Sequence, residues 1–135
     1  LMNEKASMIG LSNTHFANPC GFDNAGNYST ADDLRKIVSV FLEYPSLTEI
    51  VDNLSVDVEY IRDGDTVKKT IYTTNVMLVK EYVKGIKTGY TEDAGRCLIT
   101  LFEYEDKSKL VTILLDSEDR EKDTEQIEKI ITDLK

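Results

Sequence analysis

Apolar and polar residues alternate along this chain with the period of a helix in some segments and the period of a strand in others. After Ser29, apolar residues recur three to four positions apart, and Ser29 with Asp32 has the spacing of a capping box. The pattern predicts a helix that begins after Ser29 and ends before Pro45, with a short second helix over residues 47–51. Its apolar positions are Leu34, Ile37, Val38, Phe41 and Leu42.

The two ends of the chain also have helical signals. Residues 1–10 are expected to form the end of a helix that stops at Gly10, because glycine is the usual residue after a helix. Residues 11–28 are rich in Asn, Gly and Pro and predict an irregular segment. A last helix is expected near the C-terminus, where Ile127, Ile130, Ile131 and Leu134 fall on one face.

The period changes to two after residue 53. Leu54, Val56, Val58 and Tyr60 alternate with polar residues, which predicts a half-buried strand. Asp63-Gly64 is a hairpin turn signal, so residues 66–73 are expected to pair with that strand. After an apolar connector at 76–83, further strands are expected at 85–88, 97–104 and 110–115. Helices, antiparallel strands and a closing helix predict an α+β fold in which an antiparallel sheet packs against helices.

Composition narrows the functional classes. The chain has 135 residues, of which 41% are hydrophobic and 30% charged, as expected for one globular domain. A net charge of −9 would repel a phosphate backbone, so we expect no nucleic-acid partner. No His/Cys cluster has zinc-ligand spacing, so we expect no metal. Cys20 and Cys97 are expected to be unpaired, with Cys97 buried, although one disulfide between them stays open.

The residues with the clearest chemistry are Gly85-Ile86-Lys87-Thr88-Gly89-Tyr90-Thr91. A cation, a hydroxyl and a glycine in consecutive strand positions suit recognition of a carboxylate. The ammonium of Lys87 supplies charge and the hydroxyl of Thr88 donates a directed hydrogen bond. Gly89 has no Cβ, so a substrate backbone can lie close to the strand. Lys-Thr-Gly alone is also compatible with a turn that has no function.

Three other blocks accompany this motif in a fixed order. They are Asn13-Thr14-His15-Phe16-Ala17-Asn18-Pro19-Cys20-Gly21, then Tyr28-Ser29-Thr30-Ala31-Asp32-Asp33-Leu34, and then Thr74-Asn75. In order and spacing the four blocks resemble the D-alanyl-D-alanine carboxypeptidases, the low-molecular-weight penicillin-binding proteins. The resemblance covers nearly the whole chain. Cys20 is a departure, since many relatives have histidine there.

The resemblance implies the C-terminal portion of the β-lactamase and DD-peptidase (transpeptidase-like) fold. It also implies a serine in a Ser-x-x-Lys motif that attacks D-Ala-D-Ala and forms an acyl-enzyme, without a cofactor. Lys87 would support the charge field, Thr88 would hold the substrate's terminal carboxylate, and Gly89 would complete the motif as the third catalytic position. Tyr90 would lend its backbone N–H to the oxyanion hole, and Arg120 would face the carboxylate. Peptidoglycan stem peptides and β-lactams are the implied partners, outside the bacterial membrane.

No serine in this sequence is followed three residues later by lysine, and no Ser-x-Asn is present. We therefore expect residues 1–135 to be a single partial domain that has the carboxylate-binding wall but not the nucleophile. A non-catalytic module that binds peptidoglycan or a partner protein is the alternative, and a β-lactamase is a weaker one. A homo-oligomer is expected to cover exposed apolar surface.

The sole histidine and an acidic cluster near the last helix are expected to have structural roles. His15, the sole histidine, is expected to pack within its loop. Asp116, Glu118 and Asp119 are expected to form the solvated start of the last helix, and Arg120 beside them also fits a solvated ion pair.

Overall fold

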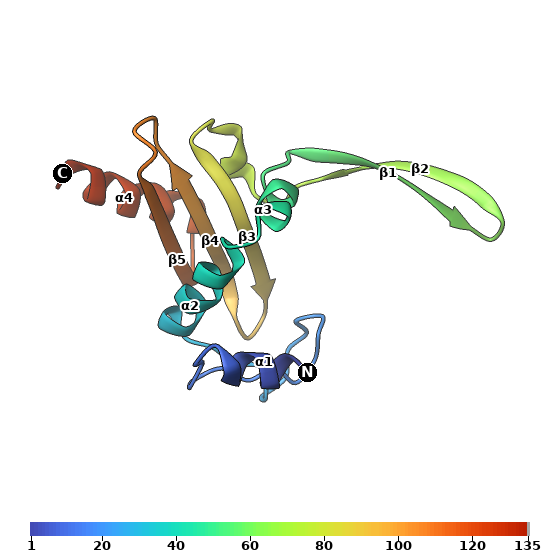
Figure 1. Ribbon diagram of the computed structural model, residues 1–135, viewed down its shortest axis with the longest axis horizontal. Helices are drawn as coiled ribbons and strands as arrows, with labels where there is room; N and C mark the ends of the chain where they lie inside the picture. Colours follow the sequence, from blue (N-terminus) through green and yellow to red (C-terminus); the bar gives the residue numbers. More distant parts are fainter. Residues whose placement is uncertain (135) are drawn as a thin grey trace.

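The computed structural model describes residues 1–134. A three-stranded antiparallel sheet in the order β3-β4-β5 forms its centre, and a separate hairpin, β1-β2, extends away from it (Figure 1). Helices and antiparallel strands in this arrangement confirm the α+β prediction. The elements are α1 (Met2–Met8), α2 (Ala31–Phe41), α3 (Pro45–Val51), β1 (Ser55–Arg62), β2 (Asp65–Tyr72), the 3-10 helix η1 (Val76–Val79), β3 (Val83–Thr91), β4 (Gly95–Glu103), β5 (Lys109–Ser117) and α4 (Arg120–Asp133).

Hydrogen bonds at the end of α1 and at the start of α2 test the predicted helix boundaries. Gly10 has a φ of +75°, and the backbone N–H groups of Gly10 and Leu11 donate to Ser7 and Ala6, which ends α1 as predicted. The predicted cap of α2 was wrong by one residue. The helix begins at Ala31, so the Thr30 side chain accepts the hydrogen bond from the Asp33 N–H, and the Ser29 hydroxyl instead lies 2.8 Å from that of Thr14.

The core lies on one face of the sheet. Leu98, Thr100 and Phe102 alternate along β4 and are at most 1% exposed. They share this face with buried Met77, Leu78 and Val83. Helix α4 packs on β4 and β5, and its Glu128 accepts a hydrogen bond of 2.8 Å from the Tyr104 hydroxyl. Leu101, also buried, points to the opposite face.

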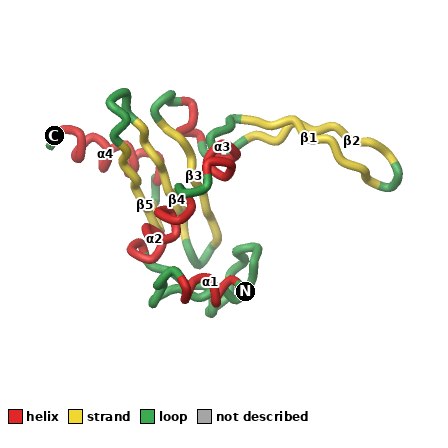
Figure 2. The backbone as a smooth tube through the Cα atoms, in the orientation of Figure 1, coloured by secondary structure: helices red, strands yellow, loops and turns green. Residues whose placement is uncertain are grey.

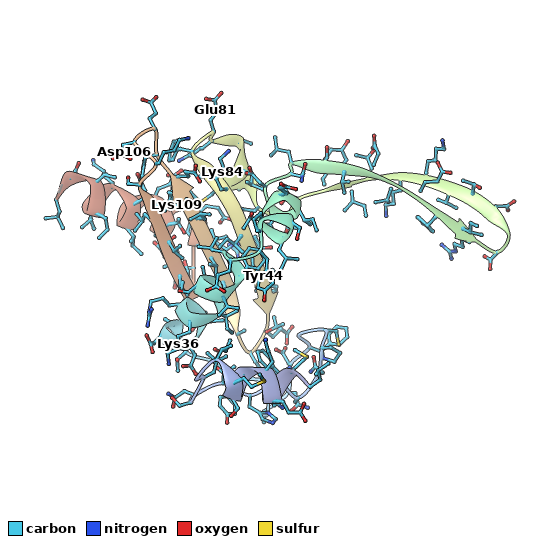
Figure 3. All side chains as sticks on the ribbon, viewed as in Figure 1. Lys36, Tyr44, Glu81, Lys84, Asp106 and Lys109 are labelled. Atoms are coloured by element: carbon cyan, nitrogen blue, oxygen red, sulfur yellow. The ribbon has the colours of Figure 1, made fainter. Side chains whose placement is uncertain are left out.

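Strand β3 is longer than the sequence predicted. Residues 85–88 have a clear strand pattern, but the strand runs for nine residues, because pairing with β4 extends its regular structure through Thr91. Since β4 lies on one side of β3 only, β3 is an edge strand among the described residues. Figure 3 shows Glu81 and Asp106 at the end of the sheet away from α1, so the Lys87–Tyr90 segment lies at the end nearer α1.

The prediction of a half-buried strand at residues 54–60 was wrong in its burial. The strand forms and pairs with β2 through the expected Asp63-Gly64 turn, but Val56 and Tyr60 remain 50% and 42% exposed. The tube in Figure 2 shows why: the hairpin extends beyond the sheet and the helices, so no described element covers it. In the last helix, likewise, Ile127 is half-buried and Ile130 and Leu134 are exposed.

Candidate functional site

The predicted site residues lie together in one groove at the α1 end of the sheet. The groove has a volume of about 810 Å³ and is formed by β3, the β3–β4 turn, the irregular segment before α2, and the first residue of α4. Lys87, Thr88, Gly89, Tyr90 and Arg120 all line it. The fold thus brings Gly89 and Arg120, which are 31 positions apart in the sequence, into contact.

Thr88 is half-buried and lies opposite Leu98 in the sheet register. Its hydroxyl oxygen is 2.6 Å from the hydroxyl oxygen of Thr74, which comes from the segment between β2 and η1. The sequence analysis included Thr74 in the resemblance but assigned it no role. No local pattern could have found this contact, because it joins two segments through the tertiary fold.

Lys87 is exposed, and its ammonium donates to the backbone carbonyl of Thr88. Gly89 pairs with Cys97, and a Cβ placed at Gly89 would lie 3.6 Å from the Cβ of Cys97, an ordinary contact. Packing within the chain therefore does not require glycine at position 89. The absence of a side chain there leaves room on the groove side of the strand.

Arg120 is more enclosed than the sequence suggested. Its side chain is 15% exposed, and Nη1 donates to the carbonyl oxygens of Gly89 at 3.0 Å and Cys97 at 3.3 Å. Nε donates to Glu121 at 2.9 Å. The reading of Arg120 as a solvated ion pair is therefore wrong, since the guanidinium ties α4 to both β3 and β4. Asp119 caps α4 by accepting from the Lys122 N–H, as expected for an acidic helix start.

The opposite wall of the groove is anchored by a buried carboxylate that the sequence analysis missed. Asp33 has no exposed surface, and its Oδ2 accepts from the Asn13 N–H at 2.7 Å and the Thr14 hydroxyl at 2.9 Å. Its Oδ1 accepts from Lys36 at 2.9 Å. The Lys36 ammonium, chiefly, holds the pKa of Asp33 below its ordinary value, although burial opposes this. The bonds fix residues 13 and 14 against α2.

The remainder of that wall is held by side chains within the loop. His15 stacks on Tyr28 with ring centroids 6.0 Å apart, and its Nδ1 lies 2.6 Å from the Gly26 carbonyl oxygen. This geometry confirms the prediction that His15 packs within the loop. Asn18 and Asn27 accept backbone N–H groups at 2.8 Å from Gly21 and 2.7 Å from Ala17.

Both cysteines line the groove and both are free thiols, as expected. Cys97 was predicted to be buried, and this was wrong: it is partly exposed, because it lies beside Gly89, which has no side chain to cover it. Among residues 1–134, no three His, Cys, Asp or Glu side chains gather in a way that could hold a metal ion.

The chain is similar in sequence to proteins of known function. The family model for D-alanyl-D-alanine carboxypeptidase matches residues 1–119. The chain belongs to the D-alanyl-D-alanine carboxypeptidase family. The carboxypeptidase DacF of Bacillus subtilis is 39% identical over 99 residues, which are 72% of this chain and 24% of the relative. A D-alanyl-D-alanine endopeptidase of Escherichia coli is 34% identical, over 73% of this chain and 31% of the relative.

Solved structures agree with the sequence relatives. A variant of the Streptomyces strain K15 DD-transpeptidase has a TM-score of 0.87 at 30% identity, covering 95% of this chain and 51% of that one. Penicillin-binding protein D2 of Listeria monocytogenes with cefotaxime bound has a TM-score of 0.78 at 29% identity, covering 96% and 52%. These matches confirm the transpeptidase-like fold. The chain spans about half the length of these structures, and a quarter to a third of the curated relatives above.

The family and the fold were thus both predicted correctly from the four sequence blocks. None of the helices within residues 1–134 combines the length and the apolar character that crossing a bilayer demands.

Proposed function

We propose that this chain forms the carboxylate-binding side of a serine-type D-Ala-D-Ala carboxypeptidase that trims peptidoglycan stem peptides outside the bacterial membrane. The observation that carries the proposal is the open edge of β3, where Lys87, Thr88 and Gly89 line the groove and Arg120 lies behind them. A free strand edge lined by cations and a hydroxyl suits an extended peptide that ends in a carboxylate.

Each residue has a distinct part in this proposal. The Lys87 ammonium and the Arg120 guanidinium make the groove attractive to an anion in a chain whose net charge is −9. Thr88 donates its hydroxyl proton to the terminal carboxylate, and Gly89 allows the peptide to approach. The backbone N–H of Tyr90 stabilises the oxyanion that forms on the scissile carbonyl.

The nucleophile in this proposal is a serine of a Ser-x-x-Lys segment, which this sequence does not contain. Its oxygen bonds to the carbonyl carbon of the penultimate D-alanine, and the terminal D-alanine leaves as a free amine that takes up a proton. Water then hydrolyses the ester and releases the shortened peptide. β-Lactams would acylate the same serine, which agrees with the cefotaxime-bound relative. The chemistry requires no metal or cofactor.

The test uses the intact protein that contains this chain. Release of D-alanine from a diacetylated tripeptide ending in D-Ala-D-Ala is expected, together with one covalent penicillin adduct per molecule by intact-mass spectrometry. If neither occurs while the peptide still binds in calorimetry, the alternative of a non-catalytic peptidoglycan-binding module replaces this proposal.

A further inference from the structure

Thr74, which belongs neither to the sheet nor to α4, makes a short side-chain contact with the predicted site residue Thr88. Its hydroxyl oxygen lies 2.6 Å from that of Thr88, and both residues line the groove. The pair joins the segment after β2 to the exposed edge of β3. The proposed function as set out above gives Thr74 no part.

The chemistry of two hydroxyls at this distance limits how Thr88 can act. A hydroxyl has one proton to donate and can accept through two lone pairs. If Thr88 donates to Thr74, its single proton is unavailable to a ligand in the groove. If Thr74 donates instead, Thr88 accepts, and its proton is directed to another acceptor. A carboxylate in the groove favours the second arrangement, because a charged acceptor makes the stronger hydrogen bond.

The segment that holds Thr74 is fixed on both sides. The Thr73 hydroxyl accepts the Asn75 N–H at 3.1 Å, and the Asn75 side chain accepts the Met77 N–H at 3.2 Å, which caps η1. Asn75 is only 5% exposed, and Met77 and Leu78 are buried in the core. Thr74 is therefore an exposed side chain on a backbone tied to the core, so it can hold its hydroxyl in place without rearrangement.

We propose that Thr74 is a positioning residue that donates its proton to Thr88 and so turns the Thr88 proton toward the carboxylate of the substrate. The inference rests on the proposed function and deepens it. Two hydroxyls in series polarise each other, so the bond from Thr88 to the carboxylate is stronger than a lone threonine would make. Preference for a free terminal carboxylate over an amide is then a property of the Thr74–Thr88 pair and not of Thr88 alone.

The test compares variants of the intact protein on two peptides that differ only at the terminus, a free acid and its amide. Thr74→Val removes the hydroxyl and keeps the shape. It should lower kcat/KM for the free acid about five- to ten-fold, the scale of one net hydrogen bond, and leave the amide nearly unchanged. Thr74→Ser should restore the free-acid value to within about two-fold, because the hydroxyl returns. Thr88→Val should reduce the preference for the free acid over the amide at least as much as Thr74→Val does.

Two further variants test the support of Thr74 and the general effect of a Thr→Val change. Thr73→Val removes the bond to the Asn75 N–H that fixes the Thr74 backbone but keeps the Thr74 hydroxyl, so it should lower kcat/KM for the free acid less than Thr74→Val does. Thr70→Val alters a threonine on the exposed hairpin, which should leave both values unchanged.

The outcomes distinguish this inference from the function on which it rests. If the wild-type protein cleaves neither peptide, releasing neither D-alanine nor D-alaninamide, the proposed function fails and the inference fails with it. If the wild type is active but Thr74→Val keeps the wild-type preference for the free acid, the inference is wrong and the function stands. Equal losses on both peptides, or no recovery in Thr74→Ser, would likewise overturn it.

Discussion

At the scale of single residues, the polar side chains that are most enclosed hold the two walls of the groove, while the exposed ones face its interior. Asp33 and Arg120 each bond backbone groups of distant segments, so their loss would loosen a wall. Lys87 and Thr88, by contrast, lie on the open strand edge, where Lys87 is exposed and Thr88 is half-buried. Substitution of Asp33 should act on stability, substitution of Arg120 on both stability and anion binding, and substitution of Lys87 or Thr88 on the proposed reaction.

Substitutions of Lys87 and Thr88 should change the proposed reaction. In the intact enzyme, Lys87→Ala should sharply lower the rate of acylation by penicillin. Thr88→Val should cost on the order of 1.5–3 kcal/mol in transition-state binding of a free-acid peptide, because a charge-assisted hydrogen bond is lost. It should cost much less with the amidated peptide, which has no carboxylate to bind. Steady-state kinetics on both peptides measure the difference, and equal losses would mean that Thr88 only supports the strand.

Substitution of Asp33 should change the stability of the folded chain. The folded state lowers the pKa of this carboxyl below 3.8, so the stability it contributes is present at higher pH and is lost as the pH falls below that value. Asp33→Asn should lower the melting temperature by several degrees near neutral pH. It should also flatten the fall in melting temperature as the pH drops below about 4, since the titrating group is gone.

Asp32→Asn is the matched control for Asp33. Arg35, mainly, and then Lys36 lower the pKa of Asp32, but its side chain is 63% exposed and solvent screens these interactions. Its substitution should change the melting temperature and its pH dependence far less. Calorimetry across the same pH range measures both variants, and an equal response from the two would contradict the role given to the buried carboxylate.

At the scale of elements, the position of β3 depends on how closely α3 packs against it. Gly85 has a φ of +100°, and a Cβ there would lie 2.9 Å from Val51 Cγ2 and 3.2 Å from the Val51 carbonyl oxygen. The preceding residue, Lys84, pairs with Asp52 at the end of α3, at 3.4 Å. Where β3 comes closest to α3, at position 85, it therefore accepts only glycine. The β3 residues that face the groove follow directly after this position.

Gly85→Ala should destabilise the fold more than Gly10→Ala, which is its matched control. Gly10 also has a positive φ, +75°, but a Cβ there would meet nothing within 4 Å, so only the backbone cost of about 1–2 kcal/mol applies. At position 85 the contacts with Val51 should add about 1–3 kcal/mol. Urea unfolding gives both values. Val51→Ala should recover part of the extra loss, and no recovery would mean that the contact with Val51 is not its source.

At the scale of the whole molecule, much apolar surface lies outside the core. Register places Val56, Tyr60, Val67 and Ile71 on one face of the hairpin, and Val56, Tyr60 and Ile71 are at least 42% exposed. No described element packs on this face, as Figure 1 shows. The open edges of the hairpin and of β3 add unpaired backbone groups. These exposed faces and edges favour self-association of the isolated chain.

The isolated chain should form a dimer or a larger species, because exposed apolar faces and strand edges tend to be covered. Light scattering across micromolar concentrations measures its mass. Ile71→Lys should shift the chain toward monomer if the hairpin face is involved, and Lys69→Arg on the same strand should not. A monomer at every concentration would contradict the prediction.

The isolated chain should also resist acylation by penicillin. None of its serines has a lysine three residues later to activate it, so no serine has the partner that the proposed reaction needs. Intact-mass spectrometry after incubation with a β-lactam should find the unmodified mass. A stoichiometric adduct on any serine would show that the chain has a nucleophile of its own.

The sequence by itself determined the elements, the family and the place of the Lys-Thr-Gly strand, because apolar periods, the Gly10 stop and the Asp63-Gly64 turn depend on neighbours a few residues away. Only the tertiary structure decided that Thr74 meets Thr88, that Arg120 reaches the carbonyl of Gly89, and that the hairpin stays uncovered. Alternation tells which residues share a face of a strand, but burial of that face depends on whether another element packs against it. Contacts across 14 and 31 positions likewise depend on how the chain returns past β3, and no local period records that path.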